Sequence, residues 1–540
     1  MDAIETGPPV TPAALARPGV PPAAFPPSPP GGPRGVLPVP PTDEEKYGYV
    51  TRRLPVLVVG SLAGVACLVV SQAGMLRSSP LLLWLFGPLL AFTLVYYLIS
   101  LRVTVSPRGF DLGAHRALVA AWRPERYPDV DVLLPVCGEP AAVLRNTWTH
   151  VRALADRYPG ACRPFVLDDA ADPGLRRMAG EFGFRYGSRD NRGWFKKAGN
   201  LHHGFERTSG PYLLVLDADF APRADLLHEL LPHLEADHRL AIVQSPQFFR
   251  VLPGQTWVER GAGAVQELFY RVVQVSRQRL DGAICVGSCA VYRRAALAEN
   301  GGTTLVEHSE DVHTGFDLRR LGWDLRYVPL ALSTGMCPDD PGAFFHQQYR
   351  WCSGSLGLLR SAKFWRTPMR TATRLCYLSG FLHYLHTALF TFVAPLVPIT
   401  LLCAFPGTLR AENVWMVLPA LVYALVVFPL WHRAPYRLEA WAVRMMYGWA
   451  HAFAVWDAVR GRSMGWRATG SPHARRQGGR VRRSGLPVWG GVTAAVWLAA
   501  AVWRCVERDP ADYALLLLTG GFYAAVVARV LLRPRIGVAA

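Results

Sequence analysis

The stretch Y-L-L-V-L-D-A-D-F (residues 212–220) joins a continuous apolar run to two carboxylates, Asp217 and Asp219. An uninterrupted apolar run is typical of a strand that is buried on both faces. Side chains two positions apart on extended backbone point to the same side, so these carboxylates can share a hard cation. Because D-x-D is also common at ordinary strand ends, the pair alone leaves a simple turn open.

The same pattern recurs on both sides of this stretch and outlines a domain over residues 105–370. Further apolar runs are V-D-V-L-L-P-V (130–136), P-F-V-L (164–167) and L-A-I-V-Q (240–244). Helical patterns lie between or after them near residues 141–157, 172–181, 196–207 and 222–235. Strands that alternate with helices predict an open α/β sheet, in which ligands bind beyond the carboxyl ends of the strands.

The composition of the 540-residue chain is too apolar for an ordinary soluble enzyme. Hydrophobic residues make up 51% and charged residues 18%, and the mean hydropathy is +0.15. The net charge of +18 comes from basic residues that gather beside the apolar runs, so we expect a membrane partner and no nucleic-acid binding. The ten cysteines form no C-x-x-C pair, and no cysteine metal site is expected.

Long apolar runs around the α/β region predict membrane spans, because each is close to the roughly 20 residues that a helix needs to cross a bilayer. The runs are 54–74, 80–101, 384–405, 414–432, 486–505 and 512–532. The stretch 438–460 is apolar but charged, and we expect it to lie in the membrane interface. The expected units are a disordered Pro-rich tail (1–42), a transmembrane hairpin (43–104), the α/β domain (105–370), an interfacial helix with a second hairpin (371–432), a cytosolic interfacial helix and loop (433–485) and a last hairpin (486–540).

Charged side chains stand at three further strand ends or helix starts. They are Asp168 and Asp169 in V-L-D-D-A, Lys196 and Lys197 in F-K-K-A-G-N, and Glu310 and Asp311 in H-S-E-D. Helix capping explains such acids, and a solvated surface explains such lysines. The chemical alternative is that a carboxylate at a helix start acts as a general base, and that a lysine neutralises a phosphate.

The stretch F-F-H-Q-Q-Y-R-W-C-S-G (344–354) sets two amides, a phenol, a guanidinium and an indole side by side, shortly before the next apolar run. A membrane helix has no use for such a cluster. A fixed cation suits a charged leaving group, and a flat ring suits the apolar face of a sugar.

The order of these motifs resembles one family. D-V-L-L-P-V-C-G-E-P, V-L-D-D-A, K-A-G-N, L-D-A-D-F, V-G-S-C-A-V-Y-R-R, S-E-D-V-H-T-G and Q-Q-Y-R-W are similar to the motifs of membrane-embedded processive β-glycosyltransferases of family 2, the bacterial cellulose synthases and their cellulose synthase-like relatives. The similarity covers residues 125–365, and the spans around them match by layout. The resemblance implies a cytosolic GT-A glycosyltransferase domain, of α/β class, inserted in an α-helical transmembrane region of about six spans plus interfacial helices.

The resemblance also implies roles for individual residues. The catalytic base would be Asp311, with Glu310 beside it. The donor site would comprise Glu139, Asp168 and Asp169 near the uridine, Lys197 and Arg350 at the diphosphate, and Asp217 and Asp219 at a Mg²⁺ or Mn²⁺ ion. The acceptor sugar would contact Gln347, Gln348 and Trp351.

The stretch G-R-S-M-G-W-R-A-T-G-S (461–471) resembles the gating loop of that family. Trp466 and Thr469 keep the spacing of its aromatic and its threonine, and they would complete the donor site. The Lys expected two positions beyond the threonine is Ser471 here, and S-E-D replaces the family's T-E-D. A disordered basic loop is the alternative.

These expectations describe an inverting, processive transferase that adds sugar from a UDP-sugar, with UDP-glucose as first choice, to a β-glucan such as cellulose. The product would cross the plasma membrane, and the catalytic domain and both termini would be cytoplasmic; extracytoplasmic accessory proteins for export are left open. The same motifs serve a hyaluronan- or chitin-like synthase that uses UDP-N-acetylglucosamine, or a mannan synthase. Q-Q-Y-R-W argues against short lipid glycosylation, and spans with few acids argue against a transporter with a cytosolic regulatory domain.

Overall fold

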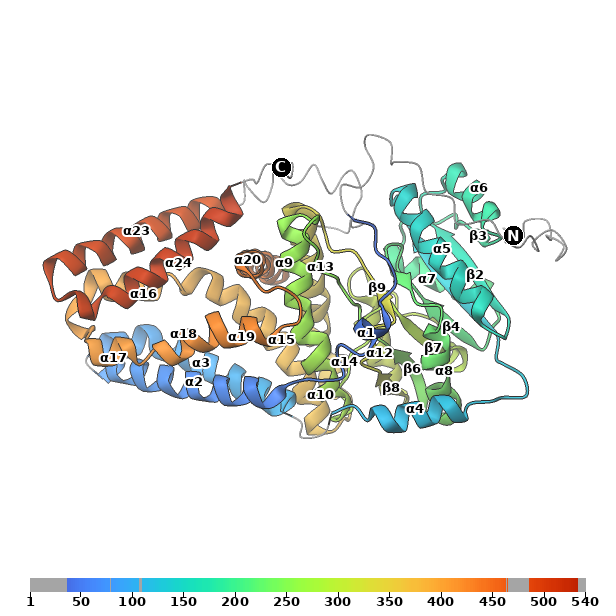
Figure 1. Cartoon of the computed structure of the whole chain (residues 1–540), viewed down its shortest axis with the longest axis horizontal. Coiled ribbons are helices and arrows are strands. Elements are labelled where there is room, and N and C mark those ends of the chain that lie inside the picture. The colour runs from blue at the N-terminus through green and yellow to red at the C-terminus, as the bar shows by residue number, and fades with distance from the viewer. Residues whose placement is uncertain (1–35, 78, 106–108, 463, 465–484, 533–540) are drawn as a thin grey trace.

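The computed structural model describes residues 36–77, 79–105, 109–462, 464 and 485–532. Figure 1 shows an α/β part at one end of the molecule and long apolar helices at the other, with several helices lying across the boundary between them. This arrangement confirms the expected α/β domain within an α-helical membrane region.

Seven strands form the main sheet in the order β3-β2-β1-β4-β7-β6-β8. They are β1 (Val130–Val136), β2 (Cys162–Asp168), β3 (Arg185–Gly187), β4 (Tyr212–Val215), β6 (Leu240–Gln244), β7 (Ala290–Arg293) and β8 (Asp324–Tyr327). Strands β1 to β4 are parallel, whereas β7 is antiparallel to both β4 and β6. Because β7 runs the opposite way, the residues that precede it lie at the carboxyl end of β4.

Helices pack on the strands of this sheet. They are α5 (Ala141–Arg157), α6 (Pro173–Glu181), α7 (Lys196–Arg207), α8 (Leu226–Ala236), α11 (Arg294–Glu299) and α12 (Glu310–Arg320). Every residue of β1 is buried, as its continuous apolar sequence predicts. Asp131 is the one charged residue of β1. Its buried carboxylate accepts hydrogen bonds from Arg163 Nε at 2.9 Å and from the amide of Ser209 at 3.0 Å.

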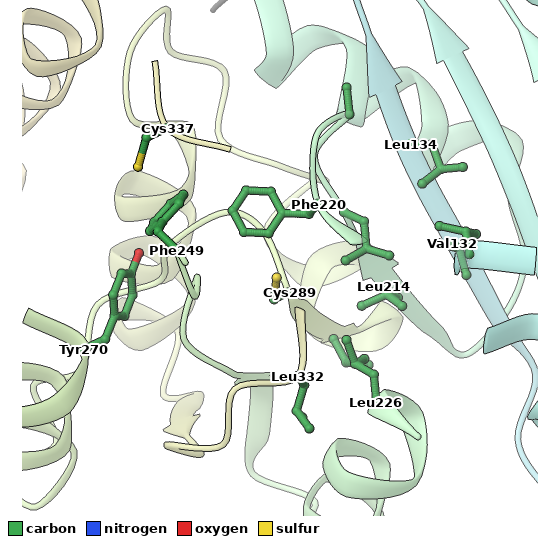
Figure 2. Close-up of a cluster of buried hydrophobic side chains, with 14 of the residues drawn as sticks. Val132, Leu134, Leu214, Phe220, Leu226, Phe249, Tyr270, Cys289, Leu332 and Cys337 are labelled. Carbon is green, nitrogen blue, oxygen red and sulfur yellow. The ribbon is translucent and has the colours of Figure 1, made fainter. Parts of the chain in front are cut away.

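The main hydrophobic core continues from the sheet toward the membrane side. Figure 2 shows Val132 and Leu134 of β1 at one edge of a buried cluster and Tyr270 and Cys337 at the other, with Phe220 between them. A small second sheet, β5 (Ala221–Pro222) and β9 (Ser333–Thr334), lies in the same region. The α/β domain therefore shares one core with helices on its membrane side.

Within the described residues, six helical stretches are long and apolar enough to cross a membrane, which agrees with the expected number. They are Leu54–Arg77, Pro80–Thr104, Thr371–Ala404, Ala411–Trp431, Val488–Glu507 and Ala514–Leu531. The elements concerned are α2 (Leu54–Arg77), α3 (Pro80–Thr104), α15 (Thr371–Val393), α16 (Leu396–Ala404), α17 (Ala411–Trp415), α18 (Leu418–Val422), η4 (Tyr423–Val427), α19 (Phe428–Trp431), α23 (Leu486–Glu507) and α24 (Ala514–Leu531). The segment expected at the interface before residue 384 is the first part of α15, and α15 ends next to Pro395.

Helices that we call the boundary helices lie between the two parts. They are α9 (Trp257–Leu268), α10 (Gln274–Gln278), α13 (Pro341–Arg360) and α20 (Leu438–Val459). In Figure 1, α9 and α13 run across the direction of α2 and α23, and α20 is seen nearly end-on. This is the orientation expected of helices that lie along a membrane surface, and α20 is not among the six candidate spans.

A buried ion pair joins this boundary layer to the spans. Arg271 lies in a π-helical turn, η2 (Phe269–Val273), and its Nη1 donates to Glu267 Oε1 at 2.6 Å. Arg271 also donates to the carbonyl of Thr51 at 2.7 Å and to that of Trp431 at 3.1 Å. Glu267 accepts from the amide of Arg433 at 3.0 Å. The pair therefore ties α9 to the start of α2 and to the end of α19.

The segment before α2 lies along the α/β domain, and we call residues 36–50 the N-terminal strap. The carbonyl of Pro38 accepts from Asn146 Nδ2 at 2.8 Å, and that of Pro41 accepts from Arg223 Nη1 at 2.6 Å. In the short helix α1 (Asp43–Lys46), Lys46 Nζ lies 2.8 Å from Asp225 Oδ2. Residues 36–42 of the expected disordered tail thus lie in this strap, whereas residues 1–35 fall outside the described part.

Candidate active site

Three elements bring charged side chains together at the carboxyl end of β4. Lys197, in the first turn of α7, forms a short ion pair with Asp217 and lies 3.5 Å from Glu310 Oε1 at the start of α12. Its Nζ also donates to the carbonyl of Gly287 at 3.3 Å. Burial alone would lower the pKa of Lys197, but Asp217 and Glu310 outweigh it and raise that pKa. The ammonium group is therefore permanently charged between two carboxylates.

Two other acids in this region have pKa values raised to near neutrality. Burial, helped by the charge of Asp217, raises the pKa of Asp219 to about 7. Burial, helped by Asp217 and Asp168, raises the pKa of Glu139 to about 7. Lys197 does not offset all the negative charge here, so the site favours an added cation.

Asp311 stands where a general base is expected. Burial and the neighbouring Glu310 raise the pKa of Asp311 to about 7. Its Oδ1 accepts from the amide of Val312 at 2.8 Å. Gly287 has φ +74°, and a Cβ there would lie 2.7 Å from Asp311 Oδ2, so this glycine lets the loop before β7 pass against the carboxylate.

Helix α13 carries the glutamine, arginine and tryptophan side chains of the Q-Q-Y-R-W motif. Gln347, Arg350 and Trp351 are partly exposed at positions i, i+3 and i+4, which form one helix face, whereas Gln348 is buried. Burial lowers the pKa of Arg350 to about 10, while Glu310 and Asp217 act to raise it. Arg350 thus shares its two carboxylate neighbours with Lys197.

A close approach of α13 to α12 fixes this geometry. A Cβ on Gly354 would lie 2.3 Å from Ser309 Oγ, so only glycine allows the contact. The carbonyl of Gly354 also lies 3.0 Å from His313 Nε2. The S-E-D and Q-Q-Y-R-W motifs, about forty residues apart in sequence, are therefore held side by side.

The two carboxylates at the end of β2 have partners within the protein. Asp168 accepts from the amides of Ala170 and Asp172, both at 2.8 Å, and from Tyr186 Oη at 2.9 Å. Asp169 forms a two-pronged ion pair with Arg189. Direct contact of either carboxylate with uridine stays a prediction.

The remaining expectations have different outcomes. Trp466 and Thr469 lie outside the described residues. No group of three or more His, Cys, Asp and Glu side chains in the described part is arranged to hold a metal ion. Asp217 and Asp219 supply two carboxylates at most, so a cation held there would need further ligands from water or a bound molecule.

Sequence reasoning missed residues that only the fold brings to the site. Ser288 Oγ accepts from the amide of Asp217 at 3.0 Å, because antiparallel β7 places it beside β4. Nothing in the sequence marks Arg189 as part of the site, apart from its position a few residues before K-K-A-G-N.

Comparison with known proteins bears on this site directly. Residues 212–428 match the family model described as Glycosyl transferase family group 2. The UDP-forming cellulose synthase catalytic subunit of Komagataeibacter sucrofermentans is 29% identical over 338 residues, which are 62% of this chain and 43% of that protein. The corresponding subunit of Pseudomonas fluorescens is 31% identical over 267 residues, 49% of this chain and 36% of that protein. These matches confirm the resemblance to cellulose synthase-like glycosyltransferases of family 2.

The extent of these matches is limited. The chain spans less than half the length of either curated relative. Among solved structures, the mannosyltransferase PcManGT from Pyrobaculum calidifontis in complex with GDP-Man and Mn2+ aligns with a TM-score of 0.42 at 18% identity, over 68% of this chain and 97% of that one. The family resemblance does not rest on that alignment.

Proposed function

We propose that this chain is an inverting, processive glycosyltransferase that polymerises sugar from a UDP-sugar, first UDP-glucose, into a β-glucan such as cellulose. The observation that carries the proposal is the convergence of Lys197 and Arg350 on Glu310 and Asp217, with Asp311 partly buried beside Glu310. Two cations fixed next to a carboxylate base suit a substrate whose leaving group is a diphosphate. Uridine is favoured because the curated relatives are UDP-forming enzymes.

A divalent ion fits the carboxylates at the end of β4. Asp217 and Asp219 would hold Mg²⁺ or Mn²⁺, and diphosphate oxygens would supply further ligands. The raised pKa of Asp219 supports this, because it shows that the site favours additional positive charge. When bound, the ion would neutralise charge on the departing diphosphate.

The protein groups then divide the chemistry among them. Asp311 takes the proton of the acceptor hydroxyl, and the hydroxyl oxygen bonds to the anomeric carbon of the donor sugar. The bond from that carbon to the diphosphate breaks, and the electron pair leaves with UDP beside Lys197 and Arg350. Attack opposite the leaving group inverts the anomeric configuration. A base with a pKa near 7 is well matched to this proton transfer.

The growing chain would enter the helical part from α13. Trp351 would offer a flat ring to the apolar face of the last sugar, and Gln347, on the same helix face, would offer its amide to the hydroxyls. The buried Gln348 would reach the sugar only from behind this face. Beyond them, polar and aromatic side chains of α3, α15 and α20 meet. Tyr96 Oη lies 3.1 Å from His383 Nδ1, and Thr387 Oγ1 lies 2.7 Å from His451 Nδ1. Such groups suit a hydroxyl-rich polymer better than an ion.

The proposed setting is the plasma membrane, crossed six times, with the catalytic domain and both termini in the cytoplasm. The boundary helices α9, α13 and α20 would lie along the cytoplasmic surface. Accessory proteins outside the cytoplasm would receive the product.

Purified protein in lipid nanodiscs tests the proposal. It is incubated with UDP-glucose, UDP-N-acetylglucosamine or GDP-mannose, with and without Mg²⁺ or Mn²⁺, and nucleotide release and product length are measured. We expect metal-dependent UDP release from UDP-glucose and a polymer that β-glucanase digests. Release from another donor would change the product to a chitin-, hyaluronan- or mannan-like chain. A product of one sugar on a lipid would refute processivity, and no turnover with any donor would leave the transporter interpretation standing.

A further inference from the structure

The ion pair between Asp169 and Arg189 is almost completely buried. Arg189 Nε lies 2.6 Å from Asp169 Oδ1 and Nη2 lies 2.7 Å from Oδ2, so both carboxylate oxygens are used. The side chain of Arg189 is only 2% exposed and that of Asp169 only 6%. A buried two-pronged pair of this kind fixes the orientation of both groups.

The same guanidinium also holds the turn before α7. Arg189 Nη1 donates to the carbonyl of Trp194 at 2.7 Å, and Nη2 donates to that of Lys196 at 3.0 Å. Arg189 therefore connects the end of β2, through Asp169, to the residues directly before Lys197.

The backbone of this turn is in an unfavourable conformation that other contacts must stabilise. Gly193, Phe195 and Lys196 have φ of +80°, +46° and +51°, and the last two are not glycines. Residues with a Cβ rarely adopt this left-handed backbone conformation. The N-cap residue of α7 is Phe195, whose side chain cannot accept a hydrogen bond from the free amides at the start of the helix. The two hydrogen bonds from Arg189 compensate for this strain.

The glycine of K-A-G-N serves the same contact. A Cβ on Gly199 would lie 2.1 Å from the carbonyl oxygen of Trp194 and 2.4 Å from Arg189 Nη1. Only glycine lets α7 approach the turn and the guanidinium this closely.

We propose that Arg189, held by Asp169, is a positioning residue that sets the turn 193–196 so that Lys197 reaches Asp217 and Glu310. Asp169 then acts through Arg189 and does not touch the uridine. The inference rests on the proposed function, because Lys197 is assigned there to the diphosphate.

A double-mutant cycle with Arg189→Ala, Lys197→Ala and both together tests the inference. Donor KM, kcat and the affinity for UDP with Mg²⁺ are measured for each variant in nanodiscs. If Arg189 acts only through Lys197, each single variant weakens UDP binding about tenfold or more, and the double variant is no worse than Lys197→Ala. Independent roles would multiply to about a hundredfold, and that outcome overturns the inference.

Further variants separate positioning from general damage. Asp169→Asn keeps the side-chain shape but removes the charge, and we expect it to weaken UDP binding through the same cycle with Lys197→Ala. Arg189→Lys keeps the charge but not the fork, and its failure to restore binding supports the two-carbonyl contact. Arg192→Ala, exposed in the same loop, should match the wild type.

The outcomes distinguish the inference from the proposed function. If wild-type protein transfers sugar but the cycle is additive, the inference fails and the function stands. If wild-type protein binds UDP but transfers no sugar, the UDP affinities of the variants alone decide the inference. If wild-type protein neither transfers sugar nor binds UDP, both fail.

Discussion

Tyr349 donates a hydrogen bond from its hydroxyl to Asp457 Oδ2 over 2.8 Å, and so joins the helix of the Q-Q-Y-R-W motif to α20. The hydroxyl also accepts from the amide of Met464 at 3.2 Å. Burial and Asp457 raise the pKa of Tyr349 to about 12, so the phenol remains a donor at every physiological pH. The middle of the Q-Q-Y-R-W motif is thus a fixed link between α13 and α20.

Loss of this link should cost stability. Tyr349→Phe removes a hydrogen bond to a charged acceptor, so we expect the free energy of unfolding to fall by about 1.5–3 kcal/mol. Asp457→Asn should cost less, since an amide oxygen still accepts. Denaturation followed by tryptophan fluorescence in detergent measures both, and equal losses would contradict the charged-acceptor explanation.

Replacement of the base should stop transfer and spare donor binding. Asp311→Asn keeps the shape of the side chain but cannot take a proton, so we expect kcat to fall by roughly 10²–10⁴-fold with little change in UDP affinity. Asp324→Asn makes the same change at a partly exposed position at the start of β8, away from the site, and should retain activity. Full turnover by Asp311→Asn would remove the base assignment.

Activity should have an acidic limb near neutrality. Asp311 must be deprotonated to act, and its pKa is raised to about 7, so kcat/KM should fall roughly tenfold per unit as the pH drops below that value. Glu310→Gln removes the neighbouring negative charge and should move the limb to lower pH. A limb that stays in place in this variant would assign it to another group.

Divalent ions should stabilise the protein most above neutral pH. The pKa of Asp219 is raised to about 7 from its ordinary 3.8, so between these values the folded state holds more protons than the unfolded state. Stability of the ion-free protein should therefore decrease as pH rises through this window. Mg²⁺ or Mn²⁺ at a hundredfold excess over Kd should add about 2.7 kcal/mol at pH 8.

Asp219→Asn separates the two effects in that experiment. It removes the unfavourable charge, so the ion-free variant should be more stable than the wild type at pH 8, yet gain little from added ions. Unfolding midpoints with and without EDTA measure this. An unchanged gain from ions would place the metal elsewhere.

The joint between α9 and the spans should be sensitive to single changes. Glu267→Ala leaves Arg271 buried without its carboxylate, and we expect a loss of about 3–5 kcal/mol in the free energy of unfolding. Arg260→Ala, on the same helix, breaks the more exposed pair with Glu439 and should cost about 1 kcal/mol or less. Similar losses for the two variants would show that burial of the ion pair is not what matters.

The sequence correctly predicted the strands and helices that have long apolar or helical patterns of their own. The strands at 130–136 and 240–244 and the helices at 141–157 and 196–207 have the expected bounds, because each has a long apolar or helical pattern. Strand β7 was missed, since four residues, A-V-Y-R, carry little signal and their place is decided by pairing with β4 and β6.

The site divides in the same way. Charged residues after strands could be predicted to meet, because the carboxyl ends of parallel strands share one edge. Asp168 and Asp169 look alike in sequence, but adjacent residues on extended backbone face opposite sides. One therefore meets Tyr186 and the other Arg189, and both partners are about twenty residues away, which no local pattern specifies.

The N-terminal strap imposes an order of events on synthesis. Its partners include Asn146, Arg223 and the amide of Ala331, which donates to the carbonyl of Lys46 at 2.9 Å. A ribosome releases the strap and α2 long before these residues exist. The first hairpin is therefore made before the N-terminal strap has its partners, and the last of these contacts forms only after nearly three hundred further residues have been translated.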